Sequence, residues 1–329
     1  MLKQIEYGKN NLRLRRARKC EVGFMRLEEW MEFSEEVLAA KEKGLPIVAI
    51  ESVVLSFGLP KPDNLRVHRA IENEIRKRGV VPATIAIIDG KLKIGLSETE
   101  LERLAESKGV EKASKRDLAW MIVKKRTGAL TVAATMVAAH LARIKIMVTG
   151  GIGGVARKAE ENFDISTDLT ELSRTPVAVV SSGVKSIMDL RKTVEFLETM
   201  GVPVIGYKTD RFPAFYFKTT DYPVVKFDSA EEVASLLKFK FKARIPGGVL
   251  VVNPVSKGLE DVMPQEKAEK LIEKAIIEAE MKGVKGGAVT PFVLSRLVEM
   301  TDREVLKVNE RLLLENAVLA ANIASAYYL

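Results

Sequence analysis

Apolar and polar positions follow two alternating patterns along this chain. Short apolar runs rich in Val and Ile, with few interior charges, are typical of buried strands. Between them, apolar positions recur every three or four residues, as in helices that cover a sheet. The predicted strands are 46–52, 83–89, 91–95, 145–149, 177–180, 203–207 and 248–253, and the predicted helices are 27–43, 63–77, 97–107, 131–142, 186–200, 229–241, 264–282, 291–300 and 304–326.

Strands separated by helices predict an α/β fold, in which a mainly parallel sheet carries helices on both faces. The pair Asp89-Gly90 predicts a hairpin between two of the strands, and the last third of the chain is mostly helical. No linker or internal repeat divides the pattern. We therefore expect a single domain over residues 31–329, preceded by a basic extension over residues 1–30 whose composition is compatible with disorder. Met31, in the first predicted helix, could itself begin the domain.

The formal charge of +8 raises the question of nucleic-acid binding. Residues 1–20 hold seven Lys or Arg and one acid, so they carry six of these eight charges. The rest of the chain is nearly balanced, as expected of an ordinary solvated surface. Nucleic acid is therefore an unlikely partner, although a basic tail could contact RNA or another acidic surface.

Cysteine usage and hydropathy indicate the cellular setting. Cys20 is the single cysteine, which excludes a disulfide framework and suggests a reducing compartment. No run approaches the roughly eighteen uncharged residues that a membrane helix requires. We expect a cytoplasmic protein with no membrane partner.

Lys185 lies in the turn Ser-Ser-Gly-Val-Lys-Ser at 181–186, directly after the apolar run 176–180. In open α/β sheets, ligands bind beyond the carboxyl ends of the strands. A lysine there, close to apolar walls, can lose its proton and attack a carbonyl carbon. The alternative is a solvated lysine near a helix start.

Two polar segments follow the strand 145–149. The first, Thr149-Gly-Gly-Ile-Gly-Gly154, could turn its amides toward an anion or could serve close packing. The second places Asp164 and Asp168 four residues apart, where Asp168 could cap a helix. Asp164 has no evident capping role, and one carboxylate with waters suits Mg²⁺ or Mn²⁺. A zinc site is not expected, because the chain has no cluster of His and Cys.

Glu51 ends the first predicted strand beside an apolar run. A carboxyl group in that position is a candidate general acid whose pKa is raised by burial, and the alternative is a cap or an ion-pair partner. His68 and His140 both lie in helical patterns, and we assign them no chemistry.

Taken together, these segments resemble the pseudouridine-5′-phosphate glycosidase family. The matching segments keep the family's order from about residue 34 to the end of the chain: 46–52 (PIVAIES), 82–90 (PATIAIIDG), 128–136 (GALTVAATM), 149–155 (TGGIGGV), 163–172 (FDISTDLTEL), 175–189 (TPVAVVSSGVKSIMD), 210–215 (DRFPAF) and 289–292 (VTPF). Such an ordered set is much more specific than any single motif.

The resemblance implies reversible cleavage of the C–C bond between uracil and ribose 5-phosphate, with a divalent metal, usually Mn²⁺. It implies Lys185 as the nucleophile that forms an imine at C1′, and Glu51 as the acid that protonates the ring oxygen. Asp164 would hold the metal largely through waters. The resemblance also implies a homotrimer. Substrate contacts are expected from Lys112, Val132, Thr149, Ser166, Thr167, Asp168 and Asn309.

Three positions depart from the family's usual sequence. Phe57 and Ala156 stand where histidines are common, and Leu130 stands where a threonine is usual. These departures put recognition of the phosphate in doubt, and Arg157 or Lys158 could replace the lost groups. Two alternatives therefore stay open: the same chemistry on an unphosphorylated or different C-nucleoside, and a non-catalytic member that binds RNA or a partner.

Overall fold

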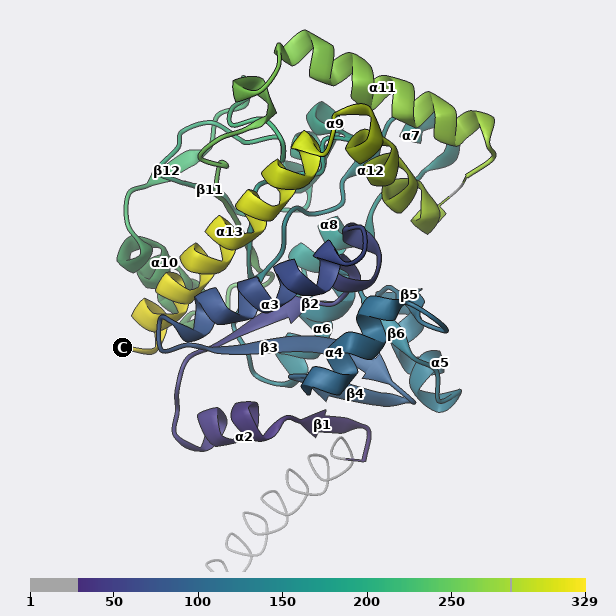
Figure 1. Ribbon diagram of the computed structural model, residues 1–329. Helices are drawn as coiled ribbons and strands as arrows, with labels where there is room; N and C mark the ends of the chain where they lie inside the picture. The colour runs from purple at the N-terminus through teal and green to yellow at the C-terminus, as the bar shows by residue number, and fades with distance from the viewer. Residues whose placement is uncertain (1–28, 285) are drawn as a thin grey trace, which may run out of the picture.

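A mainly parallel sheet forms the centre of the molecule (Figure 1). The computed structural model describes residues 29–284 and 286–329. In these residues eleven strands belong to one sheet: β1 (Met31–Phe33), β2 (Ile47–Glu51), β3 (Val81–Ile88), β4 (Lys91–Ile94), β5 (Glu111–Ala113), β6 (Gly128–Leu130), β7 (Ile146–Val148), β9 (Ala178–Ser181), β11 (Val204–Tyr207), β12 (Val225–Phe227) and β13 (Val249–Val252). The main path runs β1-β4-β3-β2-β7-β9-β13-β11-β12, with β6 and β5 joined to β3. β8 (Val155–Ala156) and β10 (Met188–Asp189) pair separately.

The predicted parallel sheet is confirmed. From β3 to β12 along the main path, every neighbouring pair is parallel. The predicted hairpin is also present, because β4 returns antiparallel beside β3 after the turn at Asp89 and Gly90. β6 is antiparallel to β3 as well, so the reversed strands gather at one side of the sheet.

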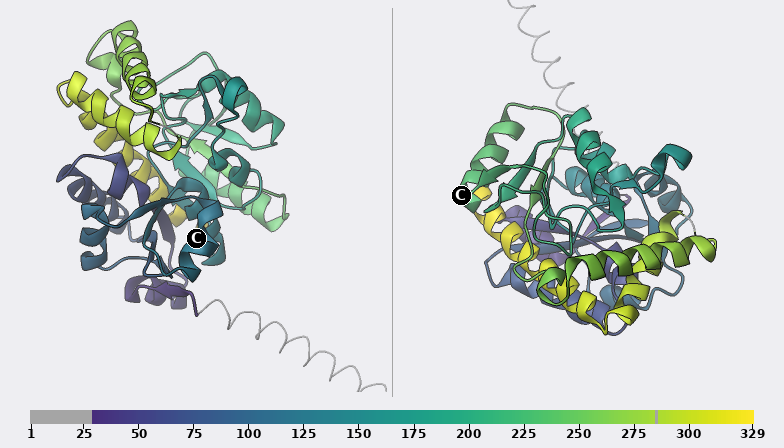
Figure 2. Two further views of the ribbon diagram at one scale, coloured as in Figure 1. Left: turned by 90° about the vertical axis from the view of Figure 1, so that its right-hand side faces the viewer. Right: turned by 90° about the horizontal axis from the view of Figure 1, so that it is seen from above.

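Both faces of the sheet are covered, as the apolar runs predict. In β2, Val48 and Ile50 enter one apolar core, whereas Ile47 and Ala49 enter the other. Two further views show helices on both sides of the sheet (Figure 2). Helices α3 (Asp63–Arg76), α10 (Ala230–Lys242), α11 (Gln265–Met281), α12 (Val289–Met300) and α13 (Glu304–Tyr328) join the first core, and α2 (Glu35–Glu42), α5 (Leu118–Val123), α6 (Val132–Leu141), α8 (Thr167–Leu172) and α9 (Leu190–Thr199) join the second.

Two predicted helices begin later than expected. The helix predicted at 27–43 is wrong at its start, because Met31–Phe33 pairs with β4 as a strand and Ser34 caps a helix that begins at Glu35. The helix predicted at 186–200 begins only at Leu190, after β10 has paired with β8 and Asp189 has capped its first turn. In both cases the first residues of the predicted helix pair with the edge of another strand, although their local pattern also suits a helix.

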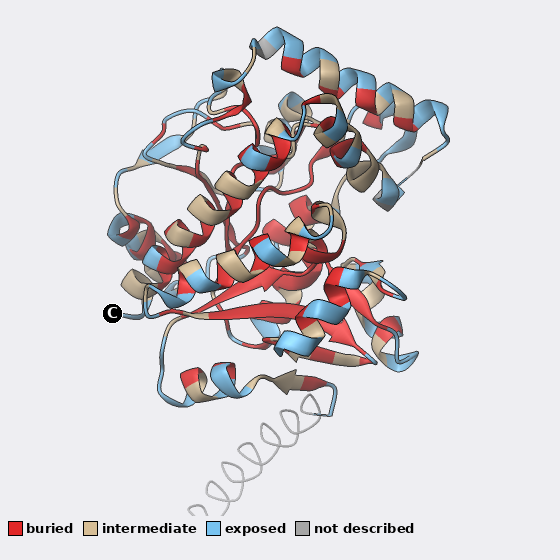
Figure 3. Ribbon diagram, viewed as in Figure 1, coloured by how far each residue is buried: buried red, intermediate tan, exposed pale blue. Residues whose placement is uncertain are grey.

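The order of the strands determines where the polar ends of the strands meet. β2, β7 and β9 are neighbours in the middle of the sheet and run in the same direction. Their carboxyl ends therefore place Glu51, Thr149 and the segment 181–186 along one edge. Every residue of these three strands is buried (Figure 3).

Two expectations fall on residues 1–28, which lie outside the described residues: the basic extension 1–30, except for its last two residues, and the basic tail on which RNA binding would depend. Within the described part of the chain, no helix is long and apolar enough to cross a membrane.

Candidate active site

Glu51 is the last residue of β2, and its side chain is 1 % exposed. The hydroxyl of Thr149 donates a hydrogen bond to its Oε1, whereas its Oε2 has no hydrogen-bond partner. The pKa of Glu51 is raised to about 7. Burial is the main cause and nearby Asp168 adds to it, whereas Lys185, Thr149 and Lys112 act in the opposite direction. Glu51 can therefore hold a proton near neutral pH and release it, as a general acid must.

Lys185 is half-buried in the turn that follows β9. Its amide donates to the carbonyl of Ile152 at 3.1 Å, and its carbonyl accepts from the amide of Met188 at 2.9 Å. The turn needs Gly183, which has a φ of +84° and whose Cβ would come within 2.1 Å of the carbonyl oxygen of Pro213. The backbone thus fixes Lys185 at the sheet edge, where its positive charge lowers the pKa of Glu51.

Lys112 lies on β5, which pairs with β6. It interacts electrostatically with Glu51 and Lys185. Its pKa is lowered, first by the desolvation of its ammonium and then by repulsion from Lys185. Asp168, Glu51 and Asp164 act in the opposite direction. The structure therefore brings together five charged groups that the sequence analysis selected from four separate segments.

Asp168 is buried, and each oxygen of its carboxyl group accepts a hydrogen bond. One of its oxygens accepts from the amide of Ala133 at 2.9 Å and the other from the amide of Gly153 at 2.8 Å. We call this arrangement the Asp168 junction, because it joins the first turn of α6 and the glycine segment to α8. Gly153 is required there, since a Cβ would lie 2.3 Å from the Oγ of Ser166.

The residues around the Asp168 junction also have structural contacts. The Oγ of Ser166 accepts from the amide of Asp168 at 3.2 Å and caps α8, so the cap is Ser166 rather than Asp168. The hydroxyl of Thr167 contacts that of Ser114 at 2.8 Å, two residues from Lys112. Val132 is buried at the start of α6, which leaves its backbone as the group that could meet a substrate.

The glycine segment 149–155 is held mainly by contacts within the protein. The amides of Thr149, Ile152, Gly153 and Val155 donate to Val180, Gly183, Asp168 and Thr193, respectively. These four amides cannot also cradle an anion. The structure therefore favours close packing over a phosphate nest for this part of the segment.

Asp164 is exposed in the turn before α8, and Asn162 accepts a hydrogen bond from its amide at 2.9 Å. Among the described residues there is no group of three or more Asp, Glu, His or Cys that could hold a metal. A single accessible carboxylate fits a hard divalent cation that keeps most of its waters, and it does not fit a zinc site.

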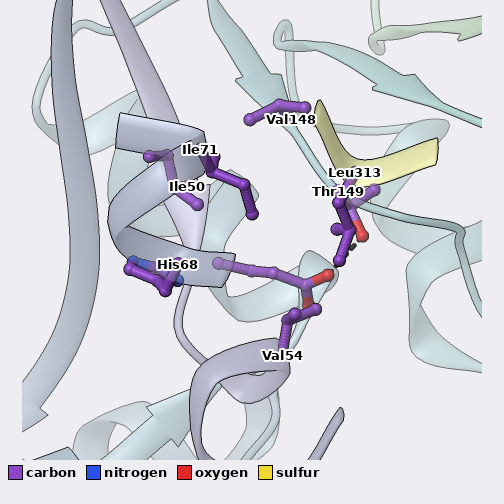
Figure 4. A pocket seen from close by; sticks show the side chains of 8 residues that line it. Ile50, Val54, His68, Ile71, Val148, Thr149 and Leu313 are labelled. Carbon is purple, nitrogen blue, oxygen red and sulfur yellow. Dashed lines mark hydrogen bonds between the residues drawn. The ribbon is translucent and has the colours of Figure 1, made fainter. Parts of the chain in front are cut away.

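A small pocket has Glu51 in its lining (Figure 4). Its empty space is about 230 Å³, including the part open to solvent. We call it the Glu51 pocket, and its lining is mostly apolar: Ile50, Glu51, Val54, His68, Ile71, Val148, Thr149 and Leu313. Asn309 is buried on α13, four residues before Leu313 and so on the same side of that helix.

The sequence analysis missed two buried polar residues near these strand ends. Asn316 of α13 is fully buried, and its amide donates to the carbonyls of Thr149 at 3.0 Å and Gly150 at 3.3 Å. An Asn inside the apolar helical run 312–324 was the available signal. His68 is also buried and lines the Glu51 pocket, although we expected no chemistry from it.

The three departures from the family's usual sequence lie in different surroundings. Leu130 is fully buried in the second core, and Phe57 packs against a small cluster that includes Leu101. Ala156 is half-buried in β8, beside the exposed Arg157. Lys158 is paired with Glu280, with 3.3 Å between the nearest atoms.

The fold and the site define a class of protein. A buried acid and a backbone-fixed lysine at the carboxyl edge of a parallel sheet are the parts of an α/β enzyme that acts on a carbonyl or a latent carbonyl carbon. The chain belongs to the family described as indigoidine synthase A like protein, whose model matches residues 36–326.

Curated relatives are similar over nearly their whole length. The pseudouridine-5′-phosphate glycosidase of Geobacillus kaustophilus is 49% identical over 299 residues, which cover 91% of this chain and 99% of the relative. The protein of the same name from Petrotoga mobilis is 48% identical, covering 92% of this chain and 99% of the relative.

Solved structures confirm the fold. The prealnumycin C-glycosynthase AlnA, crystallised in complex with ribulose 5-phosphate, has a TM-score of 0.82 at 36% identity and covers 91% of this chain and 97% of its own. An indigoidine synthase A-like protein from Thermotoga maritima has a TM-score of 0.82 at 35% identity, with the same coverage of both chains.

Proposed function

We propose that this protein reversibly cleaves the C–C glycosidic bond of pseudouridine 5′-phosphate to give uracil and ribose 5-phosphate. The observation that carries the proposal is the pairing of a buried carboxyl group, Glu51, with Lys185 at one sheet edge. The names of the relatives and the sugar phosphate bound by AlnA support this substrate class.

The bond to be broken explains why both residues are needed. A C-glycoside has no heteroatom leaving group, so protonating an exocyclic atom does not release the base. The neutral amine of Lys185 attacks C1′, the C1′–O4′ bond breaks, and the ring oxygen leaves as a hydroxyl with the proton of Glu51. The nitrogen, which carries a positive charge after the attack, returns a proton to the ionised Glu51. Its lone pair then forms a C=N bond at C1′ while the bond to uracil C5 breaks, and C5 takes that proton. Water hydrolyses the imine, which restores Lys185 and releases ribose 5-phosphate.

The remaining residues would bind and orient the substrate. Lys112, accessible beside Lys185, is the proposed phosphate contact. Ser166, Thr167, Thr149, Asn309 and the backbone at Val132 would face the sugar or the base. The Asp168 junction would hold the glycine segment and α6 in place, and the carboxylate of Asp168 also keeps lone pairs for a substrate hydroxyl.

Asp164 would hold Mn²⁺ or a similar divalent cation, largely through waters. When bound, the cation would orient the substrate and stabilise negative charge on it. We also propose that the protein acts in the cytoplasm as a homotrimer, the form that the family resemblance implies.

The decisive experiment measures uracil release from pseudouridine 5′-phosphate by the full-length protein, with and without Mn²⁺. A Lys185→Ala variant should release no uracil, whereas Lys192→Ala should match the wild type, because Lys192 lies on the surface of α9 in an ion pair with Glu160. Release that persists in Lys185→Ala would refute the imine mechanism. No release by the wild type would refute the proposed function.

The departures at Phe57 and Ala156 favour one alternative substrate, an unphosphorylated C-nucleoside. Pseudouridine assayed in parallel decides between the two. Arg157 is exposed next to Ala156 and could supply the lost phosphate contact. An Arg157→Ala variant should then raise KM for the phosphorylated substrate, and an unchanged KM would exclude this role for Arg157.

A further inference from the structure

His68 belongs to a buried chain of hydrogen bonds beneath α3. Its Nε2 lies 2.8 Å from the hydroxyl of Thr84, and that hydroxyl donates to the carboxylate of Glu72 at 2.6 Å. Glu72 in turn contacts the guanidinium of Arg76 at 3.1 Å. The chain runs from the partly exposed Arg76 to the interior of the first core.

This chain determines which nitrogen of His68 carries the proton. Thr84 has one hydroxyl hydrogen, and Glu72 receives it, so the hydrogen between Thr84 and His68 must come from Nε2. Burial lowers the pKa of His68, which keeps the ring neutral at physiological pH despite the opposing effect of Glu72. Nδ1 is therefore an acceptor with a free lone pair, and it has no hydrogen-bond partner.

A second unpartnered atom belongs to another residue that lines the Glu51 pocket. His68 and Glu51 both line the Glu51 pocket, and Oε2 of Glu51 is also buried without a partner (Figure 4). Thr149, a third polar residue in the lining, keeps acceptor lone pairs after donating to Glu51. Buried polar atoms of folded proteins are nearly always satisfied, and a space with two or three such partners suits an ordered water.

We propose that the Glu51 pocket is a binding site for an ordered water that bridges Nδ1 of His68 and Oε2 of Glu51, and that His68 is the positioning residue for the acid. The inference rests on the proposed function for its catalytic consequence but not for the water itself. The water donates one hydrogen to Nδ1, so its other hydrogen is directed to the carboxylate of Glu51. It stabilises the ionised acid after the proton has left, while Lys185, Lys112 and Asp168 face Glu51 from the other elements around it.

Two substitutions distinguish this role from a packing role. Each places an amide oxygen or nitrogen near the position of one ring nitrogen of His68 and leaves the other position empty. His68→Asn places an acceptor near the position of Nδ1 and loses the contact with Thr84. His68→Gln places a donor near the position of Nε2 and loses the acceptor for the water. A packing role through Thr84 predicts that Gln is the better substitute, whereas the water site predicts that Asn is.

The first measurement needs no substrate. A high-resolution crystal structure of the full-length protein should show a water within hydrogen-bond distance of Nδ1 of His68 and Oε2 of Glu51. The site should remain occupied in His68→Asn and be lost in His68→Gln. The chain has two histidines, so ¹⁵N-histidine NMR of a His140→Gln variant reports on His68 alone and should show the Nε2–H tautomer. A dry pocket, or a proton on Nδ1, would overturn the proposal.

The second measurement is the pH profile of kcat/KM for uracil release. Losing the water in His68→Gln should move the alkaline limb upward by about one pH unit, because the ionised acid loses a donor. His68→Asn should keep the wild-type limb. A shift in Asn but not in Gln would contradict the proposal, even if both variants fold. An inactive wild type would count against the proposed function, and the crystallographic and NMR results would still decide on the water.

Discussion

The Asp168 junction and the Glu51 pocket each contain a buried carboxyl group, with 5 % and 1 % of the residue exposed. The two groups differ in their hydrogen-bond partners. Two backbone amides satisfy both oxygens of Asp168. Glu51 receives one hydroxyl donor and keeps one oxygen unpartnered, and its pKa is raised to about 7. The two carboxyl groups are therefore both removed from water and differ in the number of donors that contact them. Hydrogen bonds to a carboxylate stabilise its charge, whereas burial without them favours the protonated form.

The largest expected effect comes from removing the acid. Glu51→Gln keeps an acceptor for Thr149 but has no proton to give, so kcat for uracil release should fall about 10²–10⁴-fold. Circular dichroism should show an unchanged fold. Retention of activity within tenfold of the wild type would show that another group protonates the ring oxygen.

The next largest effect is expected from Asp168, because both of its carboxyl oxygens accept hydrogen bonds. Asp168→Asn turns an amide NH₂ toward one of two backbone N–H donors, which should lower the free energy of unfolding by about 3 kcal/mol. Urea denaturation measures the change. The matched control is Asp164→Asn, the same substitution at an exposed position. Equal stability of the two variants would mean that the Asp168 junction does not hold its elements together.

The pH dependence of stability sharpens the comparison. Glu51 in the folded protein keeps its proton up to about pH 7, whereas in the unfolded chain it loses it near 4.5. Its contribution is thus fully present below pH 4.5 and declines as the pH rises to 7, by at most about 1.4 kcal/mol per pH unit. Subtracting the unfolding free energies of Glu51→Gln from those of the wild type at each pH isolates this contribution. Parallel curves for the two proteins would exclude it.

The smallest expected effect on stability concerns the proposed metal ligand. Asp164→Asn should change the free energy of unfolding by less than about 0.5 kcal/mol, because the side chain is exposed. The dissociation constant for Mn²⁺, measured by calorimetry, should rise by about tenfold or more. Unchanged Mn²⁺ affinity would remove Asp164 from the metal site.

Much of this site could be predicted because it lies at strand ends. Glu51, Thr149 and Lys185 each follow a recognisable apolar run, and parallel strands bring such ends to one edge. Lys112 was found through the family resemblance alone. Its strand, β5, has three residues and exists because it pairs with β6. Short strands of this kind carry no periodic pattern, so local reasoning overlooks them.

His68 and Asn316 show the opposite case. Each is a polar residue within an apolar helical pattern, and the pattern does not reveal which partners lie opposite. For Asn316 these are the carbonyls at 149 and 150, and for His68 they are Thr84 and the Glu51 pocket. The two carbonyls, Thr84 and Glu51 all belong to other elements of the fold.

The sequence by itself determined the mainly parallel sheet, the helices on its two faces, and the residue types at the strand ends, because hydrophobic periodicity is a local property. Only the tertiary structure decided that Glu51 can hold a proton near neutral pH. That property depends on desolvation and on the donors that surround each oxygen, and these come from elements distant in sequence. Five such elements contribute at Glu51: the glycine segment after β7, the turn after β9, the strand β5, the helix α8 that carries Asp168, and the helix α3 that carries His68.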